Sequence, residues 1–320
     1  MSKLPLQKLS LALALGGAFV FAAPAHANVI SYYTTVFNTD WVSAGTGGLR
    51  DGAGTITVAG VTGAATRSLL YWQGPTNSTD PTAMANIQVN GTPVTGTNIG
   101  FSDDNFWSRL NGQAYRADTT AVINGNGAYD LTGFNTATTT GNGAGTAVFF
   151  QDGNSANNRD IVVFNGNDSN FESDYDPAGW NFTLSGIHYT SGSAFLTLFV
   201  SDGQNFSSTD DGTLSINGVT VATGGIFQGA TLPGESPVGN GNLFDIVRLD
   251  ITALLSVGDN DLHIVLSDGF DDALSAIGAF IDLPAGAAPP DPNQTPEPGV
   301  LALLGLGLAG GWAARRRKRA

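Results

Sequence analysis

The sequence contains no cysteine and, between its two ends, no lysine. The absence of cysteine excludes disulfide bonds and thiol catalysis. Glutamate is almost as scarce, occurring before the C-terminal tail only at Glu172 and Glu235, whereas Gly, Thr, Asn and Asp are abundant. Because this composition disfavours helices and suits strands joined by turns, we expect an all-β protein.

Positive charge is also scarce away from the ends. The two ends hold seven of the 13 basic residues and one of the 27 acidic residues, so the part between them carries six Arg, 26 acids and a net charge of about −20. This charge excludes nucleic acid and anionic lipid as partners. It favours divalent cations as ligands, or simple solubility outside the cell.

The N-terminal 27 residues have the three parts of a secretory signal. Lys3 and Lys8 precede an apolar stretch, and Ala25 and Ala27 provide the small residues that signal peptidase accepts. We therefore expect residues 1–27 to be a signal peptide that is cleaved after Ala27. The alternative is an uncleaved membrane anchor.

The C-terminal end has a similar three-part pattern. A Pro-rich linker, 287–294, leads into a tail, 295–320, that holds a Pro-Glu-Pro motif, an apolar run from Val300 to Ala314 and a basic cluster. The residues that define the pattern are Pro296, Glu297, Pro298, Arg315, Arg316 and Arg317. The run is shorter than the ~17–25 residues of an ordinary membrane span, and basic residues resist translocation. We expect a short transmembrane helix that anchors the chain temporarily in the inner membrane.

This C-terminal pattern resembles the PEP-CTERM sorting signal of Gram-negative bacteria. The resemblance implies recognition by an exosortase and cleavage near the motif. It also implies release of the ectodomain to the cell surface or to an extracellular polymer, such as the exopolysaccharide of a biofilm.

The ectodomain is rich in short runs that alternate apolar and polar residues. The clearest runs are Gly54–Val61, Ile87–Val94, Gly145–Phe150, Ala194–Val200, Thr213–Val221 and Asp261–Ser267. Asn90-Gly91 and Asn217-Gly218 each lie between β-forming residues, and this dipeptide adopts the positive φ angles of a two-residue hairpin turn. These features predict many short strands with frequent turns.

The chain also repeats itself. Ile87–Val94 is similar to Leu214–Val221, and Ala117–Ile123 is similar to Leu249–Leu255. Each pair is followed by a turn and a strand that ends in Asp-Gly, so we expect two tandem β-sandwich domains. The breaker sequence at residues 176–179 places them at 28–176 and 177–286. The alternative is a single interleaved sandwich.

The second copy carries a further resemblance. Residues Arg248–Leu255, followed by Val257–Val265, are similar to the galactose-binding-like jelly roll, in which an Asp-x-Thr segment precedes a Gly-x-Asn turn. The resemblance implies a jelly-roll fold for the ectodomain. It does not imply sugar binding, because such modules serve many functions.

Clusters of aspartate suggest that the protein holds structural calcium. Ca²⁺ takes oxygen ligands from Asp, Asn and backbone carbonyls in loops. The candidate ligands are Asp202, Asp210 and Asp211 in one turn and Asp268, Asp271 and Asp272 in another. The alternative is that these residues only form turns.

Aromatic side chains suggest a carbohydrate site. Trp72 and Trp107 follow other aromatic residues and would stack on sugar rings if they were exposed. The alternative is that they fill the core, as aromatic residues of β-sandwiches commonly do.

No catalytic pattern stands out. Only His188 and His263 remain outside the predicted signal, and neither a nucleophile elbow nor a His-rich zinc motif is present. We therefore expect a non-enzymatic structural or adhesive protein of the cell surface or extracellular matrix, with exosortase and signal peptidase as partners during export. Its later partners would be extracellular polysaccharide or like molecules. The alternatives are a carbohydrate-binding module for exopolysaccharide and, less favoured, a glycoside-active enzyme.

Overall fold

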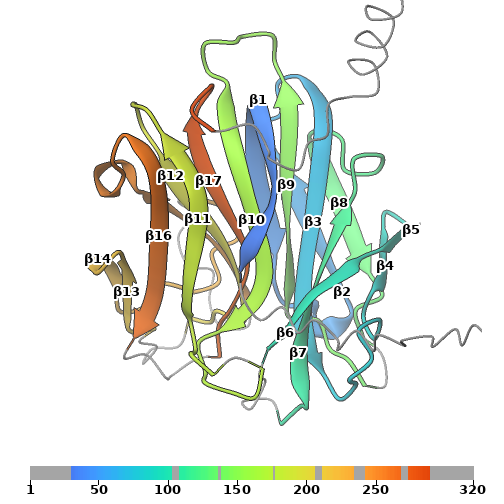
Figure 1. Ribbon diagram of the computed structural model, residues 1–320. Helices are drawn as coiled ribbons and strands as arrows, with labels where there is room; N and C mark the ends of the chain where they lie inside the picture. Colours follow the sequence, from blue (N-terminus) through green and yellow to red (C-terminus); the bar gives the residue numbers. More distant parts are fainter. Residues whose placement is uncertain are drawn as a thin grey trace, which may run out of the picture.

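The computed structural model describes residues 30–102, 108–135, 138–175, 177–205, 211–233, 242–267 and 273–288. These residues form seventeen strands and two short 3-10 helices (Figure 1). The strands of the first half are β1 (Ser31–Thr46), β2 (Ala53–Val58), β3 (Ala64–Thr76), β4 (Asn86–Val89), β5 (Thr92–Thr95), β6 (Thr97–Ser102), β7 (Asn111–Asp118), β8 (Gly127–Thr132) and β9 (Gly143–Gln151), with η1 at Leu49–Asp51. Those of the second half are β10 (Arg159–Ser169), β11 (Asn181–Tyr189), β12 (Phe195–Ser201), β13 (Thr213–Ile216), β14 (Val219–Thr223), β15 (Phe244–Asp250), β16 (Gly258–Ser267) and β17 (Ser275–Pro284), with η2 at Thr252–Leu254.

The strands make one nine-stranded and two four-stranded sheets. The large sheet has the order β15-β12-β17-β10-β1-β9-β3-β7-β6, and the small sheets have the orders β2-β8-β4-β5 and β11-β16-β13-β14. When the chain is divided between β9 and β10, the two halves show the same strand order. The first half has β1-β9-β3-β7 with β2-β8-β4-β5, and the second has β10-β17-β12-β15 with β11-β16-β13-β14. Each half is an eight-stranded jelly roll, and β6 is an extra edge strand of the first.

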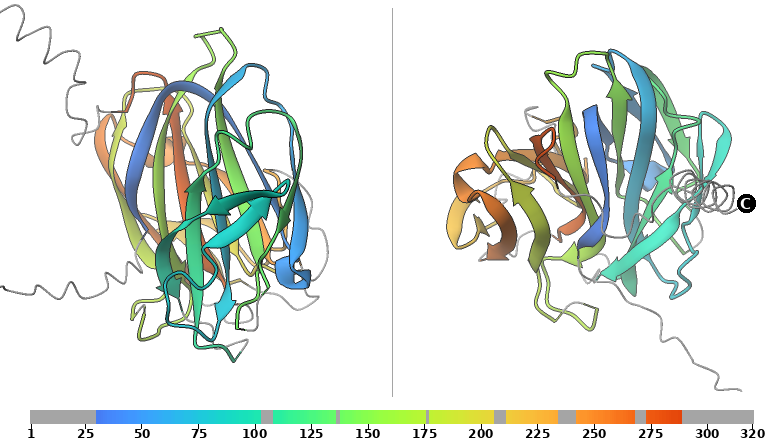
Figure 2. Two further views of the ribbon diagram at one scale, coloured as in Figure 1. Left: turned by 90° about the vertical axis from the view of Figure 1, so that its right-hand side faces the viewer. Right: turned by 45° about the horizontal axis from the view of Figure 1, so that its top comes forward.

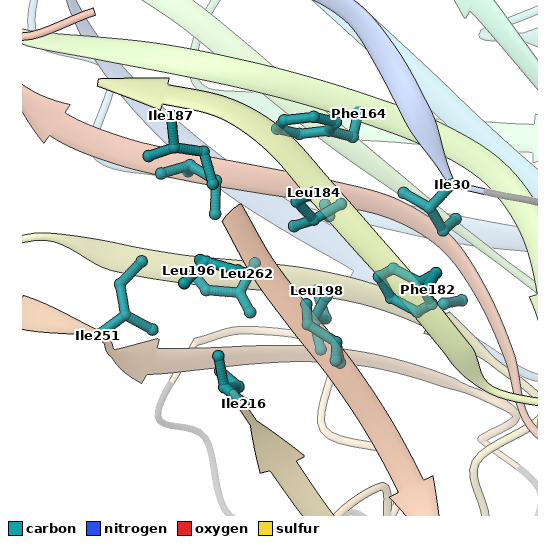
Figure 3. Close-up of a cluster of buried hydrophobic side chains, with 14 of the residues drawn as sticks. Ile30, Phe164, Phe182, Leu184, Ile187, Leu196, Leu198, Ile216, Ile251 and Leu262 are labelled. Atoms are coloured by element: carbon teal, nitrogen blue, oxygen red, sulfur yellow. The ribbon is translucent and has the colours of Figure 1, made fainter. Parts of the chain in front are cut away.

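Each small sheet covers its own half of the large sheet. In the second roll, Phe182 and Leu184 of β11 and Leu262 of β16 pack against Leu196 and Leu198 of β12 (Figure 3). An equivalent core fills the first roll between β2-β8-β4-β5 and the strands β3, β7 and β9. These two cores are the interiors of two β-sandwiches, as the sequence predicted.

A third core joins the two rolls. Leu69 and Tyr71 of β3 lie on the opposite face of that strand from Leu70 and Trp72, and they pack against the second roll. The Tyr71 ring makes edge contacts at 5.8 Å with both Phe199 of β12 and Phe280 of β17. The rolls therefore lie back to back, and the large sheet continues from one to the other (Figure 2).

Strand β1 makes the connection between the rolls. Its first part pairs with β10 and its second part, from Asp40, pairs with β9. The register shifts between Val36 and Thr39, where Asn38 has a φ angle of 51°. This irregularity redirects the strand from one roll to the other.

The division between the rolls differs from the predicted boundary at residue 176. The second roll begins with β10, at Arg159, and Pro177 lies in the loop between β10 and β11. The breaker sequence marks a loop inside the roll rather than a linker between domains. The strands of each roll are consecutive in the chain, even though the rolls share one sheet.

Matching hydrogen bonds confirm the repeat that the sequence predicted. Asn90 and Asn217 have φ angles of 48° and 52°, and the following Gly91 and Gly218 both have 75°, so both hairpins turn in the expected way. In the first roll, the hydroxyl of Thr120 accepts a bond from the Ser68 amide at 2.9 Å. In the second, the hydroxyl of Thr252 accepts one from the Ala194 amide at the same distance.

Candidate functional site

A cleft of about 720 Å³ opens where the two rolls meet. Both rolls contribute to it, since β1, β10, β12, β15 and β17 all place side chains along its wall. We call it the inter-roll cleft and define it by Asp40, Trp41, Arg159, Phe195, Arg248 and Asp282.

Asp282 holds the two arginines of the cleft in place. Its side chain is 4% exposed and forms ion pairs with the Nε of Arg159 and, at 2.7 Å, with the Nη2 of Arg248. The Nε1 of Trp41 donates a third bond to Asp282, at 3.2 Å. The arginine side chains remain 21% and 30% exposed, so one buried carboxylate positions two cations at the solvent boundary.

Aromatic rings give the same wall an apolar surface. The Arg248 guanidinium lies 4.1 Å from the ring centre of Phe195 and 5.9 Å from that of Trp41. Trp41 is half-buried and stacks on Phe280 at 5.5 Å and on Phe149 at 6.2 Å, which are residues of the core between the rolls. The cations and rings are therefore fixed by the packing behind them.

Carboxyl groups and amides complete the lining. Burial raises the pKa of Asp40, and the neighbouring charge of Asp152 raises it further. A hydrogen bond from the side chain of Asn157 lowers the pKa of Asp152, with the Asn154 amide as a second donor. The cleft thus offers hydrogen-bond donors, acceptors and stacked rings together, which is the mixture that ligand sites use to orient a polar molecule.

The structure places Trp72 away from any binding surface. Its side chain is fully buried in the first roll, where Nε1 donates to the Met84 carbonyl at 2.9 Å and the ring stacks on Tyr115 at 5.6 Å. The prediction that Trp72 stacks on sugar is therefore wrong, because β3 turns this side chain into the core. Trp107 lies outside the described residues.

The predicted calcium ligands fall into two groups. Asp210, Asp268, Asp271 and Asp272 lie outside the described residues. Asp202 is 3% exposed and forms an ion pair with Arg50 at 3.4 Å, whereas Asp211 is 2% exposed and accepts bonds from the amides of Ile226 and Phe227. Within the described ranges, no three acidic or histidine side chains gather in a metal-binding arrangement.

The two histidines lie on the outer sheet of the second roll. Nδ1 of His188 is 2.9 Å from Oδ1 of Asp259, and Nε2 of His263 is 2.6 Å from Oδ1 of Asn181. Both contacts bridge β11 and β16, so each histidine acts as a cross-strand partner in the sheet.

Sequence reasoning missed the inter-roll cleft. The six residues that define it come from five strands between positions 40 and 282, and no local motif links them. One signal that could have found it was the scarcity of positive charge, since two of the six arginines of the ectodomain line this one cleft.

Comparison with known proteins identifies the C-terminal end. Residues 294–318 match the PEP-CTERM protein-sorting motif, and this range contains Pro296, Glu297, Pro298 and the three predicted arginines. No curated protein matches the chain. Among the described residues, no helix has the length and hydropathy of a membrane span. The described residues do not include the matched range 294–318 or the predicted signal with Ala25 and Ala27. The chain therefore carries a PEP-CTERM sorting signal, which indicates an exported protein with a membrane-associated C-terminal end that an exosortase processes.

Proposed function

We propose that the exported protein is a non-enzymatic, adhesive component of an extracellular polysaccharide matrix and that it binds polysaccharide in the inter-roll cleft. The observation that carries the proposal is the arrangement of Arg159 and Arg248 beside the half-buried rings of Trp41 and Phe195. The sorting signal supports an extracellular setting for such a ligand.

The chemistry of the cleft favours a glycan with sparse carboxylate groups, because Asp40, Asp152 and Asp282 line it beside the two arginines and would repel a densely charged chain. A guanidinium has five donors, and the bonds of Arg248 to Asp282 and to Thr197 engage only Nη1 and Nη2. Its remaining donors suit a carboxylate, while the adjacent rings suit the apolar face of a sugar.

Glycoside hydrolysis is less well supported by the same cleft. The backbone amide of Asp152 donates to Oδ2 of Asp40 at 3.4 Å, and the two carboxyl groups lie next to each other. Retaining glycosidases separate their two carboxyl groups by about 5–5.5 Å and inverting enzymes by more, so that a sugar or a water fits between them. This close pair suits recognition better than hydrolysis.

The test is a binding titration of residues 28–294, which contain all seventeen strands, with uronic-acid and neutral oligosaccharides. The Arg248→Gln variant is expected to weaken binding of the acidic oligosaccharide about tenfold, equivalent to ~1.4 kcal/mol for a lost charged contact. Arg67→Gln is the matched control, because Arg67 is similarly exposed but bonds to the Tyr33 hydroxyl away from the cleft. Equal binding by wild type and Arg248→Gln would place recognition elsewhere. Release of reducing ends from the oligosaccharides would show an enzyme instead.

A further inference from the structure

A pair of buried carboxyl groups lies in the second roll, away from the inter-roll cleft. Asp245 at the start of β15 is fully buried, and Asp211 just before β13 is 2% exposed. We call them the aspartate pair. Burial raises the pKa of Asp245, and the negative charge of Asp211 raises it further.

One loop holds one oxygen of each carboxyl group. Oδ2 of Asp211 accepts bonds from the amides of Ile226 and, at 2.7 Å, Phe227. Oδ1 of Asp245 accepts bonds from the amides of Gly229 at 2.7 Å and Ala230 at 2.9 Å. These four amides come from the segment between β14 and β15, so the backbone fixes both carboxyl groups in position.

The second oxygen of Asp245 is different. Oδ2 of Asp245 is buried and accepts no hydrogen bond from the described residues. A buried carboxylate oxygen without a partner is costly, and here burial raises the pKa of the group to about 8. Such an oxygen requires a proton or a cation.

Two oxygen atoms lie close to Gly203. A Cβ atom on Gly203 would lie 1.9 Å from Oδ2 of Asp245 and 2.7 Å from the carbonyl oxygen of Phe227. Both oxygens therefore lie against the same glycine, where a larger side chain would collide with them. A carboxylate and a backbone carbonyl that converge in this way are the ligands that Ca²⁺ prefers.

We propose that the aspartate pair binds one calcium ion, with ligands from Asp245, Asp211 and the carbonyl oxygen of Phe227. The ion would compensate the two buried negative charges, which the backbone amides stabilise only in part. It would also tie the loop between β14 and β15 to the sheet and so stabilise the second roll. Of the six ligands that the sequence suggested, the site uses Asp211, and it adds Asp245 from a different strand.

The first test is thermal unfolding of the exported protein, residues 28–294, in metal-depleted buffer and with calcium. A calcium concentration about 100 times the dissociation constant should raise the midpoint by about 5 °C, and a calorimetric titration should give one ion per chain. Asp245→Asn should abolish this shift while raising the midpoint of the metal-free protein, because asparagine keeps the bonds to Gly229 and Ala230 and needs neither a proton nor a cation when it is buried. Asp261→Asn makes the same change at an exposed position of β16 and should retain the full calcium shift.

A second measurement locates the ion even if a variant is poorly folded. The Trp180 ring stacks on Phe227 at 5.3 Å, so terbium bound at the aspartate pair should emit when tryptophan is excited. Trp180→Phe should reduce this emission several-fold and leave the calcium shift in place. Absence of a calcium shift in the wild-type protein would show that the pair shares a proton instead. A shift that persists in Asp245→Asn would place the ion at other residues. Either outcome overturns the proposal.

Discussion

Phe280 provides a test of how strongly the two jelly rolls depend on each other. Its ring is fully buried between them and lies 4.7 Å from Phe199 and 5.8 Å from Tyr71, and Trp41 stacks on it at 5.5 Å. Phe280→Ala would leave a cavity among these rings without touching the core inside either roll. The prediction is that this one change destabilises both rolls together.

The magnitude follows from the loss of a buried ring and its contacts. Replacing a buried Phe by Ala costs about 3–5 kcal/mol, since the transfer free energy of the ring and the cavity term add. For a protein of this size, a loss of about 4 kcal/mol lowers the unfolding midpoint by about 8 °C. Scanning calorimetry and urea unfolding followed by circular dichroism measure this change, and both should show a single transition in wild type and variant.

Two control variants separate coupled from independent rolls. Leu131→Ala removes a fully buried side chain from the core of the first roll, and Leu262→Ala does the same in the second. Because β1 pairs with strands of both rolls, each control should shift the whole transition. Two separate transitions, of which each control moves only one, would refute the inference that the shared sheet makes the rolls one cooperative unit.

Three further predictions concern single residues. Burial raises the pKa of Asp245 to about 8, above the value of about 3.9 in an unfolded chain, so in metal-depleted buffer folding stability falls as pH rises between these two values. Urea titrations between about pH 5 and pH 7 should show a loss on the order of 3 kcal/mol in wild type and none in Asp245→Asn. Asp282→Asn weakens two ion pairs at the inter-roll cleft and should cost about 2 kcal/mol in chemical denaturation, whereas an unchanged midpoint would mean that solvent already compensates both arginines. Gly91→Ala and Gly218→Ala force a positive φ angle on alanine and should each cost about 1 kcal/mol; a much larger loss at one hairpin would contradict their structural equivalence.

Local patterns in the sequence predicted the parts of this protein that depend on neighbouring residues. The C-terminal Pro-Glu-Pro motif, the Asn-Gly hairpins at 90–91 and 217–218, and the Asp-x-Thr segment ending at Thr252 all have the form that short-range chemistry dictates. The repeat was also visible, because the equivalent turns of both rolls need the same residue types.

The features that only the tertiary structure decided depend on which faces of the strands are covered by other elements. Strand β3 reads Leu69-Leu70-Tyr71-Trp72, an unbroken apolar run, because one face lies in the core of the first roll and the other lies against the second. Such a run does not reveal which side chains point which way, so neither the burial of Trp72 nor the contact between rolls could be predicted. The inter-roll cleft and the aspartate pair have the same origin. Packing of segments that are distant in the sequence brings Asp282 to Trp41 and Asp245 near Asp211, and no local signal encodes this packing.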